Sequence, residues 1–159
     1  MGEEAAQQKL HRMALEIAEK LSGDDAPVIF IGVQNSGEVI AAAVASYLKK
    51  YLPNEIKVIS VLLDIYVPEE VTLSENIDLD NKNIIIADDV CNRGQTLLYA
   101  LKPLLEFHPR RIQTLVMVER MYKNFPVKPD YVGLSIATTT QDFVRVETKD
   151  GKVTGAFVE

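Results

Sequence analysis

Cysteine is nearly absent from this sequence, which has one cysteine, Cys91, in 159 residues. A single cysteine cannot form a disulfide within the chain, so we exclude a fold stapled by disulfides. Histidine is also scarce, and His11 and His108 lie too far apart to show the ligand spacing of a zinc site. With 47% hydrophobic residues, the chain is long enough for one domain with a proper core, over residues 1–159.

The sequence also lacks a charged-then-apolar leader and any long apolar span. Since a membrane helix needs about 20 mostly apolar residues, we expect a soluble cytoplasmic protein with no membrane partner. Basic residues are outnumbered, because 17 Lys and Arg stand against 23 Asp and Glu, for a net charge of −6. This balance works against nonspecific nucleic-acid binding, with a local basic patch as the alternative.

Short apolar runs alternate with helical patterns along the chain. The runs predict strands over 28–33, 56–63, 84–87, 111–118 and 131–136. The helical patterns cover 3–22, about 36–52, and 96–107, where Pro103 is expected to kink the helix. This alternation predicts an α/β fold with a central, mostly parallel sheet flanked by helices. The tail, 143–146 and 153–157 across Asp150-Gly151, predicts a C-terminal hairpin.

Two adjacent acids, Asp88 and Asp89, directly follow the apolar run 84–87. Ligands of open α/β sheets bind at the carboxyl ends of strands, so this pair is a candidate binding site. A turn around Gly94 comes next and precedes a helical pattern, where free backbone N–H groups attract anions. The combination suits a ribose 5-phosphate, whose hydroxyls would donate to the acids while the turn holds the phosphate. The alternative is a surface turn that only caps a helix.

The segment 84–96 resembles the phosphoribosyl-diphosphate (PRPP) loop of type I phosphoribosyltransferases, in which an apolar strand precedes two acids and Thr-Gly-x-Thr. Four residues match that pattern: Asp88, Asp89, Gly94 and Thr96. Arg93 stands where the family usually has threonine. Its guanidinium either binds phosphate bidentately or points to solvent or pairs with Asp89.

Other segments resemble the uracil phosphoribosyltransferase/pyrimidine-operon attenuator branch (PyrR-like) of this family. Residues 125–133 are similar to its base-binding hood, 32–37 lies at its pyrophosphate loop, and 63–66 resembles the start of its flexible catalytic loop. Order and spacing agree from about Gln7 to Val146. The resemblance implies the type I phosphoribosyltransferase fold with a small hood.

The resemblance also implies transfer of phosphoribose from PRPP, with magnesium, to a nucleobase such as the pyrimidine uracil. The implied ribose and phosphate ligands are Asp88, Asp89, Asn92, Arg93, Gly94, Gln95 and Thr96. The implied pyrophosphate loop is Gln34, Asn35, Ser36 and Gly37. No residue is assigned directly to the metal. Many members of the family are dimers, so we expect a homo-oligomer.

The base-binding role falls, by the same resemblance, on Tyr131, which would stack on a flat base, and on the backbone of Val132, which would read its edge. The alternative for Tyr131 is a core position at the start of a strand. Glu119, Arg120 and Lys123 are expected to flank the same mouth.

Several positions depart from the family pattern on the pyrophosphate side. The segment 34–36 is neutral where the branch has a basic residue, and Val67 replaces an expected arginine. Asn92 stands where some branches have an acid, and Asn cannot take a proton at neutral pH. Between Asp64 and Asn83, six acids stand against one base, Lys82, and a lid of that charge would repel pyrophosphate. Two function hypotheses therefore stand: a weak phosphoribosyltransferase, or a non-catalytic nucleotide- or PRPP-binding regulator.

Overall fold

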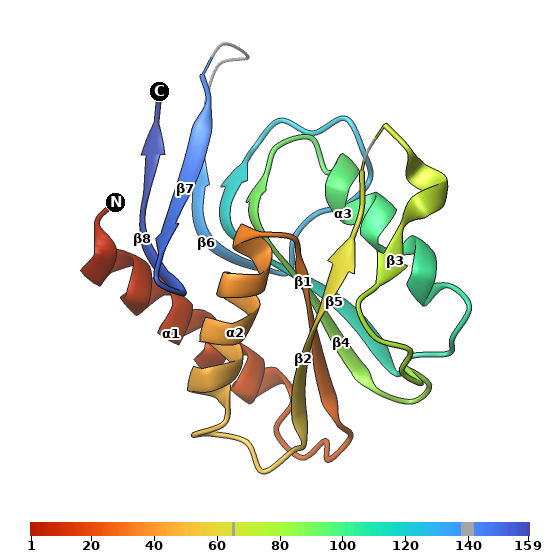
Figure 1. Cartoon of the computed structure of the whole chain (residues 1–159). Helices are drawn as coiled ribbons and strands as arrows, with labels where there is room; N and C mark the ends of the chain where they lie inside the picture. Colours follow the sequence, from red (N-terminus) through yellow and green to blue (C-terminus); the bar gives the residue numbers. More distant parts are fainter. Residues whose placement is uncertain (65, 138–141) are drawn as a thin grey trace.

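A six-stranded sheet forms the centre of the protein, for which the computed structural model describes residues 1–64, 66–137 and 142–159 (Figure 1). The strand order is β3-β2-β1-β4-β5-β6, and every neighbouring pair is parallel except β2 and β3. The strands are β1 (Val28–Val33), β2 (Ile56–Leu62), β3 (Thr72–Leu73), β4 (Asn83–Cys91), β5 (Arg111–Arg120) and β6 (Tyr131–Ile136). The predicted α/β fold with a mostly parallel sheet is confirmed.

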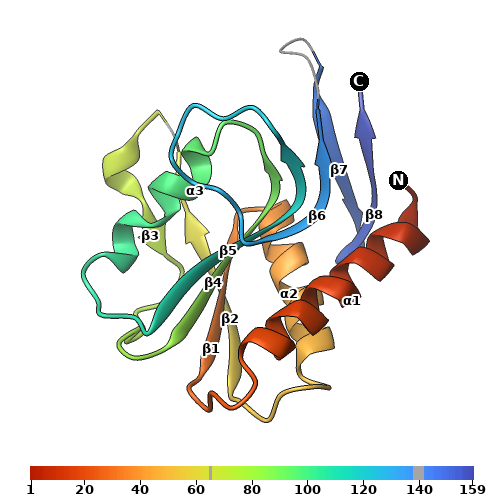
Figure 2. The same ribbon diagram turned by 180° about the vertical axis from the view of Figure 1, so that it is seen from behind.

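Helices cover both faces of this sheet (Figure 2). Helices α1 (Glu3–Lys20) and α2 (Ser36–Leu48) lie on one face, where Leu10 and Val44 join a core cluster with Phe30 of β1. The short α3 (Gln95–Ala100) and the 3-10 turn η2 (Lys102–Leu104) cover the other face, where Leu97 packs in a second cluster with Ile31. Successive residues of β1 thus enter opposite clusters, as the pleat of a strand buried on both faces requires. No helix in the described part of the chain is long and apolar enough to cross a membrane.

The C-terminal hairpin is confirmed as a separate antiparallel pair, β7 (Val144–Lys149) and β8 (Lys152–Val158). Its turn places Asp150 and Gly151 at φ 53° and 73°, the positive values that a tight two-residue hairpin turn needs. Val153 is fully buried in the same core cluster as α1 and α2. The hairpin therefore extends the core on the face of the sheet that α1 and α2 cover, and Figure 1 shows it beside α1.

Strand β4 is longer than the sequence pattern predicts, because it continues through the two acids to Cys91. The neighbouring β5 also continues, and Asp88 pairs with Val116 while Val90 pairs with Val118. Pairing with β5 therefore extends β4 through its polar residues. The predicted helix over 96–107 divides into α3 and η2, with Pro103 in the second piece, as the expected kink requires.

Candidate functional site

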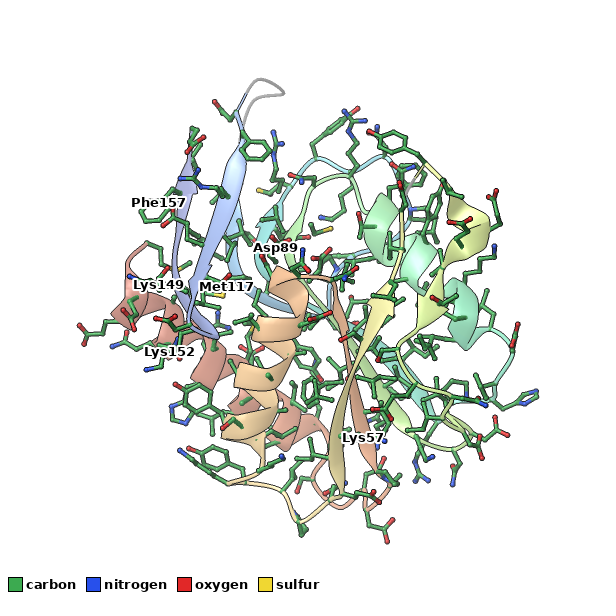
Figure 3. All side chains as sticks on the ribbon, in the orientation of Figure 1. Lys57, Asp89, Met117, Lys149, Lys152 and Phe157 are labelled. Carbon is green, nitrogen blue, oxygen red and sulfur yellow. The ribbon has the colours of Figure 1, made fainter. Side chains whose placement is uncertain are left out.

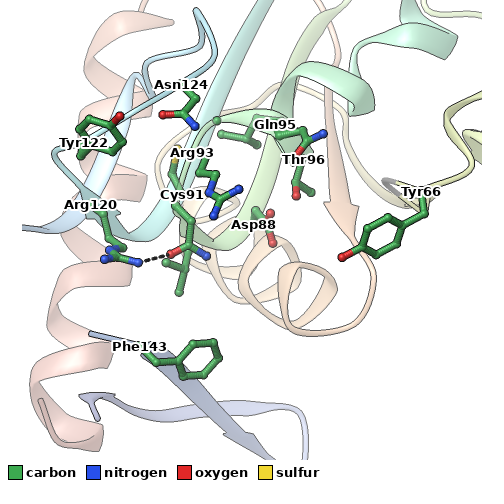
Figure 4. Close-up of a pocket in the computed structure, with 14 residues that line it drawn as sticks. Tyr66, Asp88, Cys91, Arg93, Gln95, Thr96, Arg120, Tyr122, Asn124 and Phe143 are labelled. Carbon is green, nitrogen blue, oxygen red and sulfur yellow. Dashed lines mark hydrogen bonds between the residues drawn. The ribbon is translucent and has the colours of Figure 1, made fainter. Parts of the chain in front are cut away.

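A cavity of about 1010 Å³ opens at the carboxyl ends of β4 and β5 (Figure 4). It gathers Asp88, the turn over 92–96, Arg120 from the end of β5, and side chains from three further segments. Six of the seven residues predicted to bind ribose phosphate line it, and the seventh, Asp89, does not. The strand-end location follows from the parallel sheet, whose carboxyl edge is the usual place for ligands.

Asp88 is the buried acid of this cavity, with 7% of its surface exposed. One of its oxygens, Oδ1, accepts a hydrogen bond from the backbone N–H of Asp89 at 2.8 Å. Burial raises the pKa of Asp88 well above its usual value, and the negative charge of Asp89 beside it raises the pKa further. Asp88 therefore presents a poorly solvated carboxyl to the cavity. A hydrogen bond from a ligand hydroxyl would offset the free-energy cost of burying this group.

This raised pKa makes Asp88 a source of pH-dependent instability. The folded state holds the Asp88 proton more tightly than the unfolded chain does, so the protonated carboxyl adds to the free energy of unfolding. This stabilising contribution is fully present below about pH 3.9, the usual pKa of an aspartate. It is lost as pH rises through the raised pKa of the folded state. Asp88→Asn removes this titrating buried carboxyl, so we expect it to raise Tm at pH 7 by a few degrees, on the order expected for 1–2 kcal/mol. Thermal unfolding at pH 4 and pH 7 measures the difference.

The matched control is Asp25→Asn, since Asp25 is exposed. That variant should leave Tm unchanged at both pH values. A lower Tm for Asp88→Asn at pH 7 than for the unaltered chain would show that the Asp88 carboxylate is satisfied in the fold.

The turn after β4 is shaped by Gly94, whose φ of 86° lies in the left-handed region that favours glycine. A Cβ there would lie 3.2 Å from the carbonyl oxygen of Phe125, so the turn is closely packed from behind. Gly94 directly precedes α3, and the first N–H groups of a helix have no carbonyl partner within it. The half-buried Gln95 and Thr96 therefore offer backbone donors and, from Thr96, a hydroxyl to an anion in the cavity.

Arg93 is exposed and lines the cavity, and Figure 4 shows its side chain beside Asp88 and Thr96. The ion pairs found among the described residues do not include a pair between Arg93 and Asp89. A second arginine, Arg120, also lines the cavity, and its Nη1 donates a hydrogen bond to Oδ1 of Asn92 at 3.4 Å. Two guanidinium groups therefore face this cavity, so its wall is basic although the chain is acidic.

The predicted pyrophosphate loop lies beside the acid pair. Gln34 and Asn35 form the turn after β1, and Ser36 and Gly37 begin α2. A Cβ on Gly37 would lie 2.6 Å from the carbonyl oxygen of Ala87 and 3.3 Å from Cα of Asp88, so only glycine permits this approach. The loop residues themselves stand outside the cavity lining in the described structure.

Tyr131 and Val132, the residues predicted to bind the base, do not line this cavity, and their base-binding role stays a prediction. Tyr131 is fully buried, and its hydroxyl donates to Gln113 Oε1 at 2.7 Å. The carbonyl of Val132 accepts a hydrogen bond from Arg12 Nη2 at 3.0 Å. In the strand ladder Val132 pairs with Val116 of β5, which pairs with Asp88 of β4, so both residues lie near the level of Asp88 in the sheet but outside the cavity lining. The core position, the alternative for Tyr131, is confirmed by its burial.

Aromatic side chains that the sequence analysis did not assign to the site line the cavity instead. Tyr66, Tyr122 and Phe143 are 87%, 69% and 57% exposed, although large apolar side chains are usually buried. Phe143 is held in place by its backbone, since its N–H donates to the carbonyl of Glu159 at 3.0 Å. The sequence signal for Phe143 was an aromatic residue directly after the polar run 138–142. The pattern over 143–146 predicts a strand of the C-terminal hairpin there instead.

The acidic lid is smaller than predicted. Glu75 pairs with Lys57 at 2.7 Å, and Asp80 Oδ1 accepts the backbone N–H of His108 at 2.7 Å. Both contacts lie at the amino end of the sheet, and Figure 3 shows Lys57 at the opposite end from Asp89. The acids that follow the carboxyl end of β2 are Asp64, Glu69 and Glu70, with no base among the described residues of that segment.

Cys91 lines the cavity but is not a candidate nucleophile. Burial raises the pKa of its thiol to about 11, although the charge of Lys123 acts to lower it. Since the thiolate is the reactive form, this cysteine is inert at neutral pH. It fills space at the end of β4, where it is 2% exposed.

Comparison with known proteins agrees with this geometry. The phosphoribosyl transferase domain model matches residues 3–150. The chain is 32% identical over 156 residues to the bifunctional protein PyrR of Clostridium novyi, covering 92% of this chain and 87% of that protein. It is 31% identical over 156 residues to PyrR of Limosilactobacillus reuteri, covering 91% and 87% of the two chains.

Solved structures share the fold. The hypoxanthine phosphoribosyltransferase of Trypanosoma cruzi superposes with a TM-score of 0.79 at 19% identity, covering 91% of this chain and 82% of that one. A hypoxanthine-guanine phosphoribosyltransferase of Bacillus anthracis gives a TM-score of 0.73 at 21% identity, covering 91% and 83%. The family model spans nearly the whole chain, and three of the four residues that match the PRPP-loop pattern, Asp88, Gly94 and Thr96, line the strand-end cavity. The chain therefore belongs to the type I phosphoribosyltransferase family.

Proposed function

We propose that the cavity binds a ribose 5-phosphate group and that the chain is a phosphoribosyltransferase acting on PRPP and a nucleobase, a pyrimidine such as uracil. The supporting observation is the meeting, in one cavity, of the buried carboxyl of Asp88, the turn 92–96 and exposed aromatic rings. The similarity to PyrR proteins supports the pyrimidine class, because the segments 125–133, 32–37 and 63–66 resemble the uracil phosphoribosyltransferase (PyrR-like) branch of the family.

Each part of the cavity has a role in this proposal. Asp88 accepts hydrogen bonds from the ribose hydroxyls, and the N–H groups at the start of α3 hold the 5-phosphate. Arg93 adds a positive charge and a planar guanidinium fork that matches two phosphate oxygens. Transfer breaks the bond between ribose C1 and pyrophosphate and forms a bond from C1 to a base nitrogen. Magnesium enters as part of the substrate, bound by the diphosphate oxygens and water, the pattern usual for this ion.

The residues on the pyrophosphate side of the site favour a low rate of transfer. The loop 34–36 contributes no charge toward the departing pyrophosphate, and Val67 contributes none from the lid. Loss of one well-placed charge partner typically costs about 3–4 kcal/mol in the transition state, or about 10²–10³ in rate. Asp64, Glu69 and Glu70 add repulsion on the lid side. Ribose-phosphate binding is therefore proposed to be stronger than catalysis.

Phe143 is the proposed stacking surface for the base. Replacing it with alanine removes an exposed ring from the cavity wall, and stacking of a base on an aromatic residue contributes about 1–3 kcal/mol. We expect Phe143→Ala to weaken UMP binding about tenfold in calorimetry and to leave ribose 5-phosphate binding unchanged, because the latter ligand has no base. Phe157→Ala is the control, since this ring is also exposed but lies outside the cavity lining. Equal losses for both ligands would remove Phe143 from the base site.

The second candidate function is a non-catalytic regulator that binds nucleotides or PRPP. Neutral residues at 34–36 and Val67 favour it, because they affect transfer and not ribose-phosphate binding. The homo-oligomeric state, the cytoplasmic location and the organisation of residues 1–159 as a single domain stay predictions from the sequence.

A regulator that acts through RNA would need a basic surface. The basic pairs lie on separate segments: Lys49 and Lys50 follow α2, Arg110 and Arg111 stand at the start of β5, and Lys123 and Lys128 lie between β5 and β6. The net charge of the chain is −6. We expect no specific binding of pyrimidine-operon leader RNA at physiological salt, with or without UMP, in a gel-shift series. Retardation at submicromolar protein that weakens steeply with salt would establish an RNA-binding face.

A further inference from the structure

The turn that faces the cavity is held from behind by a second loop. The carbonyl oxygen of Arg93 accepts two hydrogen bonds, from the backbone N–H of Asn124 at 3.1 Å and of Phe125 at 3.0 Å. The carbonyl oxygens of Phe125 and Val127 also face Gly94, where a Cβ would lie 3.2 and 3.3 Å from them. The conformation of the turn therefore depends on where the loop 124–127 lies.

This loop is anchored at its start by a largely buried ion pair. Lys123 Nζ binds Glu119 Oε1, and the two side chains are 16% and 9% exposed. Lys123 Nζ also donates a hydrogen bond to the carbonyl oxygen of Arg120 at 3.3 Å. This bond links the Lys123 side chain back to the last residue of β5. The other oxygen of Glu119, Oε2, accepts a hydrogen bond from the Ser135 hydroxyl of β6 at 2.9 Å. Glu119 thus ties β5, β6 and the loop together.

The charge on Glu119 is held firmly. Burial acts to raise the pKa of Glu119, but hydrogen bonds from Lys123 and Ser135 outweigh it and leave the pKa below its usual range. A buried ion pair adds little net stability, because desolvation offsets attraction. The position of this ion pair, between β5 and the loop behind the turn, points to a role in fixing that loop.

We propose that Glu119 and Lys123 are positioning residues for phosphate binding: they fix the loop 124–127, which holds the Arg93 carbonyl and so shapes the turn 93–96. The inference rests on the proposed function, in which this turn binds the 5-phosphate. Neither Glu119 nor Lys123 lines the cavity, so both act through the loop.

The first arm of the test measures amide hydrogen exchange on the full chain. In Lys123→Met the stem length is kept and the charge is lost, so exchange at Asn124 and Phe125 should become about tenfold faster. Lys123→Arg should restore protection, because a guanidinium can also pair with Glu119. Lys57→Met, which breaks the exposed Lys57–Glu75 pair at the other end of the sheet, is the matched control and should change neither amide.

The second arm is calorimetry with ribose 5-phosphate and with UMP. Lys123→Met should raise both dissociation constants by the same factor, about tenfold, because both ligands place a phosphate in the turn. Weaker binding of UMP alone would assign the pair to the base side and overturn the proposal, as would unchanged exchange at Asn124 and Phe125. If the wild-type chain binds neither ligand, the proposed function is refuted, and so is the claim that Glu119 and Lys123 support phosphate binding. Intact binding in Lys123→Met refutes the positioning role alone.

Discussion

Replacing Asp88 and Asp89 together with asparagine is expected to abolish measurable binding of UMP and of PRPP. Each carboxylate can accept hydrogen bonds from ribose hydroxyls, and a hydrogen bond to a charged group contributes about 1.5–3 kcal/mol. Two such losses raise the dissociation constant by about 10² or more. Asp88 lines the cavity and Asp89 does not, so Asp88→Asn alone should account for the larger share. Calorimetric titration of the single and double variants measures this.

The matched control for this double replacement is Asp78→Asn with Asp80→Asn. These two acids are also close in sequence, but Asp80 accepts the backbone N–H of His108 at the opposite end of the sheet. The control should keep wild-type affinity for both ligands. Unchanged affinity in the Asp88/Asp89 double variant would sink the assignment of the acid pair to ribose.

The turnover of the wild-type chain with uracil, PRPP and magnesium is expected to be far below the enzyme median of about 10 s⁻¹. Val67 starts the 3-10 turn η1 (Pro68–Glu70) and follows Tyr66, whose ring lines the cavity. An arginine there would reach toward the pyrophosphate side and restore one charge partner. We therefore expect Val67→Arg to raise kcat by about 10-fold or more, measured as UMP formed per second.

Val67→Met separates charge from size, since it lengthens the side chain without adding a charge. It should leave kcat at the wild-type value. A wild-type turnover near the median, or equal rates for Val67→Arg and Val67→Met, would contradict the claim that missing positive charge limits transfer.

The sheet was predictable because its strands carry strong local signals. Runs such as 28–33 are too short for helices, and the helical patterns between them require parallel crossovers. The end of β4 was not predictable, because it depends on pairing of Asp88 with Val116, a residue distant in sequence. Local patterns also cannot show that Glu75 is drawn to Lys57, away from the lid.

The phosphate side of the candidate site was predictable because its residues are contiguous. Asp88 and 92–96 form one strand-turn-helix segment, so their neighbourhood in space follows from their neighbourhood in sequence. The aromatic wall of the cavity was not predictable, since Tyr66, Tyr122 and Phe143 come from separate segments that meet only in the fold. The motif places Tyr131 near the level of Asp88 in the sheet, but it could not show that the Tyr131 ring is buried in the core and stays outside the cavity lining.

The central claim is that the cavity binds a ribose 5-phosphate group, and titration of the unaltered chain with UMP and with PRPP, each with magnesium, tests it most directly. Calorimetry should show saturable binding of both ligands at one site per chain, with uridine binding far more weakly because it lacks the phosphate. Absence of heat for UMP and PRPP, or equal affinity for UMP and uridine, would contradict the account.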